Sequence, residues 1–367
     1  MPDRAFNFSA GPGTLPEPVL RKAQQDVWDI DSSGVGILEH SHRGKVFDRI
    51  TEEAEADCRE IGSIPDDYAV FWMQGGATSQ CYFVPANLLA EDRTADYFRT
   101  GKWANDSIKE APLYGSCHIC ASSKEANYSY IPTGGEVAHS ENPAYVHFTS
   151  NNTIMGTEFQ AEPRAPAGAP LVCDASSDIY SKPIDVSKYG LIYAGAQKNL
   201  GPAGVTLVIA RKDLIAEPVR ALPSMMQYRK HADAQGRFNT PPTFGVYLMG
   251  EVFKWIKAEG GLKAMGEHNR AKAAIVYDFL DAQDFYTPHA RADSRSLMNI
   301  TFKCPTPELD KLFIAEAGKQ GLKEMKGHRS IGGMRASMYN AFPTTGARAL
   351  VDFMKTFAHQ HAAGAGA

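Results

Sequence analysis

The stretch GLIYAGAQKNLGPAGVTLVIARK, residues 190–212, places a lysine between two apolar runs. GLIYAG stops just before Gln197 and Lys198, the following NLGP predicts a turn, and GVTLVIA begins directly after it. Short apolar runs bounded by turn residues are typical of buried strands. Lys198 is therefore expected where a buried strand ends. A lone lysine in a loop is usually a solvated surface charge; the alternative is a lysine held in a pocket to form a Schiff base.

Residues 68–210 around this stretch alternate between strand-like and helix-like patterns. We predict strands at YAVFWM, ADYFRTG, AYVHFT, LVCDA, GLIYAG and GVTLVIA, with helices at TSQCYFVPANLLAE and WANDSIKEA. Continuous apolar strands with helical crossovers indicate a mostly parallel sheet that is covered on both faces. The expected fold is α/β, and in such sheets ligands gather at the carboxyl ends of the strands.

A second, smaller α/β unit is predicted after Pro241–Pro242. Residues 245–282 read as two helices broken near Gly260–Gly261. Residues 298–304, 306–322, 330–340 and 346–361 then read as strand, helix, strand and helix. We expect a large domain over residues 16–262, and a small domain that combines 1–15 with 263–367. The low-complexity tail, residues 361–367, is expected to fray.

The overall composition excludes several classes of protein. With 367 residues and a formal net charge of -4, the chain gives no reason to expect nucleic acid or an anionic membrane as a partner. The N-terminus does not resemble a signal peptide, and no apolar run approaches the roughly 20 residues of a membrane span. Six cysteines without framework spacing favour a reduced, cytoplasmic protein. Cys117 and Cys120 form a lone CxxC, which we interpret as part of a strand; no metal site is predicted.

Chemical groups stand at successive strand ends of the first domain. They are Gly75–Gly76–Ala77–Thr78, then Trp103, Thr153, Asp174 and finally Gln197–Lys198. Each has an ordinary interpretation alone, as a tight turn, a core aromatic or a helix cap. Together they match pyridoxal 5'-phosphate, which needs a phosphate cradle, a stacking face, a carboxylate for its ring nitrogen and a lysine for its aldehyde.

At this point the chain resembles the phosphoserine aminotransferase family of pyridoxal-phosphate enzymes. The resemblance covers almost the whole chain and rests on FNFSAGPG, SHRGKVF, QGGATSQ, GKWANDSIKEA, CDASSDI, GAQKNLGPAG, FNTPPT and GHRSIGGMRASMYNAF. It implies a homodimeric transaminase of the aspartate-aminotransferase fold (fold type I). In that fold the large domain contains a mostly parallel sheet of the seven-stranded type, and a smaller α/β domain accompanies it. Gly13 departs from the family, which more often has a residue with a side chain there, and we assign it no function.

The resemblance also implies cofactor roles. Lys198 resembles the lysine that forms the Schiff base, Asp174 the partner of the pyridine nitrogen, and Trp103 the stacking ring. The implied phosphate ligands are Gly76, Ala77, Thr78 and Gln197, with Thr153 contacting the cofactor nearby. Asn239 and Thr240 resemble a pair that reaches the phosphate from the partner subunit.

The resemblance further implies the substrates glutamate and phosphohydroxypyruvate, with phosphoserine and 2-oxoglutarate as products, in serine biosynthesis. By resemblance, Arg335 binds the α-carboxylate that all substrates share. The distal phosphate or carboxylate is assigned to His42, Arg43, His328 and Arg329. Alone, each of these is more often a solvated loop charge. Arginine nevertheless suits both anions, because its guanidinium makes paired hydrogen bonds to carboxylate and phosphate. The sequence leaves open whether phosphohydroxythreonine is a second substrate.

Two alternatives stay open from the sequence. One is another fold-type-I enzyme, such as a small-substrate aminotransferase or a cysteine desulfurase; the late basic cluster around Arg335 has no purpose for cysteine. The other is a non-enzymatic anion-binding protein that uses the same glycine and arginine loops, and that protein would be colourless.

Overall fold

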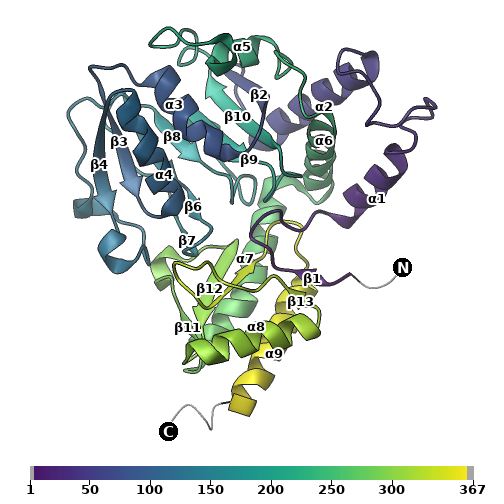
Figure 1. Ribbon diagram of the computed structural model, residues 1–367, viewed down its shortest axis with the longest axis vertical. Coiled ribbons are helices and arrows are strands. Elements are labelled where there is room, and N and C mark those ends of the chain that lie inside the picture. The colour runs from purple at the N-terminus through teal and green to yellow at the C-terminus, as the bar shows by residue number, and fades with distance from the viewer. Residues whose placement is uncertain (1–3, 362–367) are drawn as a thin grey trace.

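The protein is described here from a computed structural model, in which residues 4–361 are placed. Most of the tail that we expected to fray, residues 362–367, lies outside the described residues. Figure 1 shows a large α/β part above a smaller one, with helix α7 (Gly261–Asp281) running down from the first into the second. Among the described residues no helix is both long and apolar enough to cross a membrane.

A seven-stranded sheet forms the centre of the large part. Its strands in spatial order are β2 (Tyr68–Gln74), β10 (Val205–Arg211), β9 (Leu191–Gly195), β8 (Leu171–Asp174), β5 (Val146–Thr149), β3 (Thr94–Arg99) and β4 (Ser116–Ser122). β10 runs antiparallel to both of its neighbours, and the other pairs are parallel. The mostly parallel sheet that the sequence predicts is confirmed, and this is the large-domain sheet of fold type I.

Helices cover both faces of this sheet because successive strand side chains point to opposite sides. Val70 and Trp72 of β2 join one apolar cluster, while Ala69, Phe71 and Met73 join another. The first face carries α1 (Glu17–Asp26), α2 (Lys45–Gly62) and α6 (Thr243–Ala258), and the second carries α3 (Gln80–Leu88), α4 (Lys102–Glu110) and α5 (Tyr228–Asp233). A small hairpin of β6 (Asn151–Asn152) and β7 (Thr157–Glu158) projects from the end of β5.

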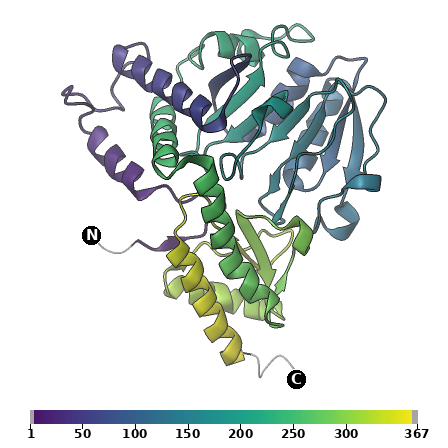
Figure 2. The same cartoon turned by 180° about the vertical axis from the view of Figure 1, so that it is seen from behind.

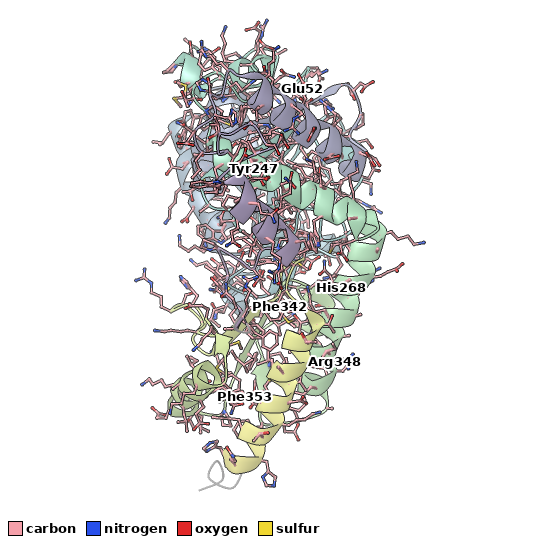
Figure 3. All side chains as sticks on the ribbon, turned by 90° about the vertical axis from the view of Figure 1, so that its right-hand side faces the viewer. Glu52, Tyr247, His268, Phe342, Arg348 and Phe353 are labelled. Carbon is pink, nitrogen blue, oxygen red and sulfur yellow. The ribbon has the colours of Figure 1, made fainter. Side chains whose placement is uncertain are left out.

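The smaller part has its own core and its own sheet. Three antiparallel strands, β11 (Thr287–Pro288), β12 (Asn299–Lys303) and β14 (Met334–Ser337), pack with α7, α8 (Pro307–Lys319) and α9 (Thr344–His361). From behind, α7 and α9 run side by side (Figure 2). Figure 3 shows His268 of α7 near Phe342, and Arg348 and Phe353 along α9. The N-terminal β1 (Phe6–Asn7) pairs in parallel with β13 (Leu322–Lys323), which attaches this strand to the smaller part.

Glycines fix two boundaries in this part of the chain. Gly260 and Gly261 have φ of +93° and +72°, which ends α6 and starts α7 where the sequence predicts the break. The predicted strand over residues 330–340 is too long, because only Met334–Ser337 pairs as a strand. Gly332 and Gly333 have φ of +79° and +63°, and this left-handed backbone keeps the preceding residues in a loop.

Candidate active site

Lys198 lies in the turn between β9 and β10, at the carboxyl end of the sheet. The turn is fixed by backbone hydrogen bonds from Leu200 and Gly201 to the Ala196 carbonyl and from Ala196 to the Val205 carbonyl. The lysine is 9% exposed, and its Nζ donates to Thr153 Oγ1 over 2.7 Å. It is therefore a buried amine with a single hydroxyl partner, and the surface-lysine interpretation is wrong.

The environment of Lys198 favours a neutral amine. Burial lowers the pKa of Lys198 to about 8, and the nearby positive charge of Arg335 acts in the same direction. The carboxylates of Asp174 and Asp178 oppose this, because they stabilise the charged form. A lysine with a pKa near 8 is partly unprotonated at neutral pH, which is what a nucleophile or a general base requires.

Asp174 ends β8 and is held by Ser176. Its Oδ1 accepts hydrogen bonds from the backbone N–H and the hydroxyl of Ser176, over 3.1 and 2.6 Å. The Ser176 hydroxyl in turn accepts from the Gly195 N–H over 3.1 Å, which ties the carboxylate to the neighbouring strand β9. Burial raises the pKa of Asp174, whereas Lys198 and Ser176 oppose the rise. No pattern in the sequence predicts this role of Ser176.

The predicted phosphate cradle follows β2. Gly75 has a φ of +90°, and its N–H donates to the Gly204 carbonyl over 3.0 Å. A Cβ built on Gly75 or Gly76 would have no neighbour within 4 Å, so open space lies in front of this turn. Ala77 and Thr78 then begin the short helical turn η1 (Ala77–Ser79), which continues into α3. The first N–H groups of such a helix have no partners within it and suit an anion.

Gln197 lies beside this cradle. A Cβ on Gly195 would be 2.7 Å from Gln197 Oε1 and 3.4 Å from the Ala77 Cβ, so the amide borders on the start of η1. Gln197 Oε1 is buried and has no hydrogen-bond partner among the described residues. A buried polar atom without a partner indicates that a ligand or water satisfies it.

Trp103 forms a wall of the Lys198 pocket. Lys198 Nζ lies 5.8 Å from the centroid of its ring. The ring packs against a small apolar cluster of Ile154, Met155 and Ile331, and its Nε1 is buried without a partner among the described residues. Thr153 and Trp103 therefore both lie next to the lysine. This agrees with the predicted roles of Trp103 as the stacking ring and of Thr153 as a contact to the cofactor.

One member of the late basic cluster, Arg335, lies near Lys198. Arg335 lies on β14, is partly buried and makes no side-chain hydrogen bond or ion pair within residues 4–361. It is close enough to Lys198 to lower the pKa of the lysine. His328 begins the loop before β14, and its Nδ1 lies 2.8 Å from Ser330 Oγ. Arg329, next in the chain, is exposed. The structure thus places Arg335 near Lys198, and it places Arg335 and Arg329 near His328.

Four predicted residues lie at the surface of the large part. His42 and Arg43 precede α2 and contact each other over 3.4 Å; across the described range, no hydrogen bond or ion pair joins them to the late cluster. The loop that carries them extends from the right-hand side of the molecule in Figure 1. Asn239 donates to Gln74 Oε1 over 2.8 Å, and Thr240 is exposed. Within one chain these four side chains are not assembled around Lys198.

The N-terminal segment packs against the lysine, which the sequence analysis did not predict. The Gly13 N–H donates to the Gln197 carbonyl over 2.7 Å, and a Cβ on Gly11 would lie 3.5 Å from Lys198 Cγ. The Tyr339 hydroxyl donates to the Ala10 carbonyl over 2.6 Å. A Cβ on Gly13 would be 2.6 Å from Tyr339 Cδ2, so a side chain there would displace the ring. Gly13, to which we assigned no function, thus borders on the active-site turn.

Cys117 and Cys120, the two cysteines of the CxxC, do not form a shared thiol site. Cys117 and Cys120 both lie on β4, but they pack into clusters on different faces of the sheet. Cys120 approaches Asp96 and His139 in an arrangement with metal-ligand geometry. Both ring nitrogens of His139 are already engaged, however, by Asp96 Oδ2 at 2.8 Å and by the Arg164 carbonyl at 2.9 Å. Burial raises the pKa of the Cys120 thiol to about 12, which disfavours the thiolate that binds metals.

Pyridoxal 5'-phosphate fits the residues that meet here. Open backbone at Gly75–Gly76 and the start of η1 can hold its phosphate, and the unpartnered amide of Gln197 borders on that space. Asp174 Oδ1 is occupied by Ser176, which fixes the carboxyl group so that its second oxygen can face the ring nitrogen. Trp103 offers a flat face, and Lys198 offers an amine with a lowered pKa.

Comparison with known proteins finds a family and relatives that match nearly the whole chain. The family model of the class-V aminotransferases matches residues 5–350. A phosphoserine aminotransferase of Desulfotalea psychrophila is 50% identical over 358 residues, covering 98% of this chain and 99% of the relative. One of Lysinibacillus sphaericus is 49% identical over 362 residues, covering 98% and 100% of the two chains.

Solved structures agree with these relatives. The phosphoserine aminotransferase of Bacillus circulans subsp. alkalophilus superposes with a TM-score of 0.95 at 46% identity, over 98% of this chain and 99% of the other. The pyridoxal-phosphate-bound enzyme of Trichomonas vaginalis gives a TM-score of 0.92 at 36% identity, over 96% and 100%. A lysine with a lowered pKa, a carboxylate fixed for a ring nitrogen and a glycine cradle are the parts that a pyridoxal-phosphate-dependent transaminase needs, and the chain belongs to the class-V aminotransferases and, within them, to the phosphoserine aminotransferase family.

Proposed function

We propose that this transaminase moves an amino group between glutamate and 3-phosphohydroxypyruvate, giving 2-oxoglutarate and phosphoserine, and that the residues named above carry the individual steps. The observation that supports this most directly is the pairing of Lys198 with Arg335. A buried amine with a pKa of about 8 lies near a partly buried guanidinium that has no acceptor within the described part of the chain. Partial burial of an arginine without an acceptor costs free energy, and a bound anion that accepts its hydrogen bonds offsets this cost.

Lys198 is the general base and acid of the proposed mechanism. When bound, pyridoxal phosphate supplies an aldehyde that takes the amino group and a ring that accepts the electrons of the broken bond. Lys198 Nζ would remove the proton from the substrate α-carbon and then return it to the former aldehyde carbon of the cofactor, acting first as base and then as acid. Thr153 Oγ1, which accepts a hydrogen bond from this amine, holds it in position between the two transfers.

Asp174 and Trp103 maintain the conditions for this proton transfer. Burial raises the pKa of Asp174, and Lys198 and the Ser176 donors oppose that rise, which favours the anionic form. That anion holds a proton on the ring nitrogen. Trp103, packed on Ile331 and Met155, covers one side of the pocket and excludes water from it.

The anionic ends of the substrate meet cations on two sides. Arg335, facing Lys198, is proposed to bind the α-carboxylate, and His328 and Arg329 the distal phosphate or carboxylate. Paired hydrogen bonds from a guanidinium suit both anions. His42 and Arg43 are proposed to join the distal site; phosphohydroxythreonine, which has the same phosphate, is proposed as a further substrate.

The remaining predicted residues support a homodimer with shared sites. Among residues 4–361 no hydrogen bond or ion pair joins His42, Arg43, Asn239 or Thr240 to Lys198, and exposed apolar side chains accompany them. Trp28 is 86% exposed and Leu38 57% in the loop before His42, and Phe238 is 38% exposed beside Asn239. A second copy that covers these side chains would bring the four polar residues to the neighbouring pocket. We also propose a cytoplasmic location, which the six free cysteines support.

One preparation tests the function against its alternatives. The purified protein, supplied with pyridoxal phosphate, should be yellow and bleached by borohydride, and should form phosphoserine from glutamate and phosphohydroxypyruvate. A colourless protein would support an anion-binding role, and release of sulfide from cysteine would support a desulfurase. Efficient use of alanine with no reaction of phosphoserine would favour a small-substrate aminotransferase.

A further inference from the structure

Lys102 is a cation next to the active site that has no role in the mechanism above. It is the first residue of α4 and immediately precedes Trp103. Its Nζ lies 5.0 Å from the centroid of the Trp103 ring, and Lys198 Nζ lies 5.8 Å from the same centroid. The two amines therefore lie around one aromatic ring, and a substrate bound beside that ring would experience both charges.

The same ring connects Lys102 to the loop that binds the distal anion. Trp103 packs against Ile331, which lies between His328–Arg329 and β14. Burial lowers the pKa of His328, and three cations lower it further: in order of effect, Arg335, Arg329 and Lys102. Across the described residues, no carboxylate opposes them at this histidine. Lys102 is thus close enough to the distal site for its charge to be felt there.

Asp106 holds Lys102 in place but does not neutralise this group of charges. The lysine amine donates to Asp106 one turn further along α4, and Lys109 Nζ lies 3.7 Å from the other oxygen of the same carboxylate. One carboxylate is therefore shared by two lysines. The side chain of Lys102 is 44% exposed, so it can move toward a ligand without unfolding its surroundings. Lysine is a compact charge on a flexible stem, which suits such a movement.

We infer that Lys102 is a specificity-determining residue of the distal site, one that favours a phosphate monoester over a carboxylate through its place beside Trp103, whose ring packs against Ile331 of the distal loop. The inference rests on the proposed function. At neutral pH a phosphate monoester carries roughly 1.5 to 2 negative charges and a carboxylate one. Because Coulomb energy scales with ligand charge, an added cation stabilises bound phosphoserine more than bound glutamate.

The test uses the holoenzyme and three variants on one helix. Lys102→Met removes the charge, and Lys102→Arg keeps it. Lys109→Met is the matched control, because Lys109 shares Asp106 but has neither the ring contact nor an effect on His328. The reactions of phosphoserine and of glutamate are each measured as KM and kcat. We expect Lys102→Met to raise KM for phosphoserine about fivefold, an effect near the upper limit of one partly exposed charge pair. KM for glutamate should change less than twofold, kcat should be unaffected, and Lys102→Arg should restore most of the loss.

Two equilibrium measurements separate charge from structure. Inorganic phosphate is titrated into the holoenzyme by calorimetry, and its affinity should fall several-fold in Lys102→Met but not in Lys109→Met. The pKa of His328, followed by NMR in the same proteins, should rise in Lys102→Met alone, because one of the cations that lower it is gone. Lys102→Gln serves as a second neutral variant if the methionine disturbs the helix.

The results separate a failure of the proposed function from a failure of the role of Lys102. If the wild-type protein turns over neither phosphoserine nor glutamate, the proposed function is wrong. If the wild type uses both, but Lys102→Met affects them equally or Lys109→Met has the same effect, only the role of Lys102 is overturned. An unchanged His328 pKa and unchanged phosphate affinity in Lys102→Met would overturn it as well.

Discussion

The Lys198 amine donates a 2.7 Å hydrogen bond to the hydroxyl of Thr153, a residue 45 positions earlier in the chain. Lys198 follows β9, whereas Thr153 follows the β6 strand beyond β5, so the contact joins the carboxyl ends of two separate strands. It defines where the reactive nitrogen lies before any ligand is present, and the first prediction concerns that nitrogen.

Capture of pyridoxal phosphate by the cofactor-free protein should depend on pH through Lys198. Because the pKa of the buried amine is lowered to about 8, the fraction of neutral amine rises as the pH increases from 6.5 to 8.5. We expect the capture rate, followed by absorbance, to rise over this range and level off above it. A rate that still rises steeply beyond pH 9.5 would indicate an ordinary lysine pKa. Lys198→Ala should show no borohydride-trapped adduct and no transamination.

Ser176→Ala should weaken the hydrogen bonding that fixes the Asp174 carboxylate and lowers its pKa. The substitution removes the hydroxyl donor to Asp174 Oδ1 and the link to the Gly195 N–H. We expect the pKa of Asp174 to rise further and kcat to fall about tenfold, as loss of about 1.4 kcal/mol of stabilisation implies.

The matched control for Ser176 is its neighbour. Ser177→Ala removes a hydroxyl that donates to the Asn151 carbonyl and does not touch Asp174. Ser176→Ala should also move the acid limb of the kcat profile to higher pH, which a merely structural defect would not do. Identical profiles in the two variants would contradict the positioning role of Ser176.

Arg335 and Arg329 should differ in which substrates they affect. Arg335→Gln is expected to weaken glutamate and phosphoserine alike, because both carry the α-carboxylate. Arg329→Gln should impair phosphoserine more than alanine, which has no distal anion. Hydrogen bonds to charged groups contribute roughly 1.5–3 kcal/mol each, and kcat/KM for the substrates measures the loss. Equal losses of phosphoserine and alanine in Arg329→Gln would exclude a distal role.

Mixed dimers should reveal whether the active sites are shared. One chain carries Lys198→Ala and the other carries Asn239→Ala with Thr240→Ala. If this pair serves the partner's cofactor, a mixed dimer has one doubly defective site and one intact site, and mixing restores activity to at most one site per dimer. Asn239 also donates to Gln74, which directly precedes the cradle of its own chain, so the experiment distinguishes a shared site from a site within one chain. No recovery, with subunit exchange demonstrated by mass, would mean that the pair serves its own chain.

Lys272 should make stability depend on pH between 7 and 10. This lysine of α7 is fully buried, and its Nζ donates to the carbonyls of Tyr339 at 2.7 Å and Phe342 at 3.3 Å. Burial lowers its pKa to about 7, whereas the unfolded chain holds the proton to about pH 10.4. In that window the unfolded state binds more protons, so the free energy of unfolding rises with pH.

Lys272→Met removes this titration. The difference in unfolding free energy between the wild type and Lys272→Met should therefore grow in favour of the wild type from pH 7 to pH 9, as measured by urea denaturation. Lys263→Met, on the exposed side of the same helix, is the control and should show a constant difference. A constant difference for Lys272→Met would mean that the buried lysine stays protonated in the folded protein, as it is in the unfolded chain, from pH 7 to pH 9.

Local patterns were enough to predict the elements and their chemistry. The apolar run before Gln197–Lys198 and the turn after it predict a strand end, and Gly260–Gly261 mark the helix break, because these signals act on neighbouring residues. Gly75, Asp174 and Lys198 each follow an apolar strand, and the carboxyl ends of parallel strands lie at one edge of a sheet. The shared location of these residues could therefore be inferred before any distance was known.

The tertiary structure alone decided which more distant side chains complete the pocket. Ser176 bridges Asp174 to β9, Tyr339 holds the Ala10 carbonyl, and Gly13 lies on the Lys198 turn. These contacts join segments that lie far apart in the sequence at irregular separations. Neither a sequence repeat nor the local propensity of a segment predicts such contacts. Their geometry is set by how β1 attaches to the small part and how β14 approaches the large one. The sequence by itself determined the residue types and their order along the strand ends. The packing of the two parts determined that Lys198 lies near Arg335, which has no side-chain partner among residues 4–361, and next to the segment that contains Gly11 and Gly13.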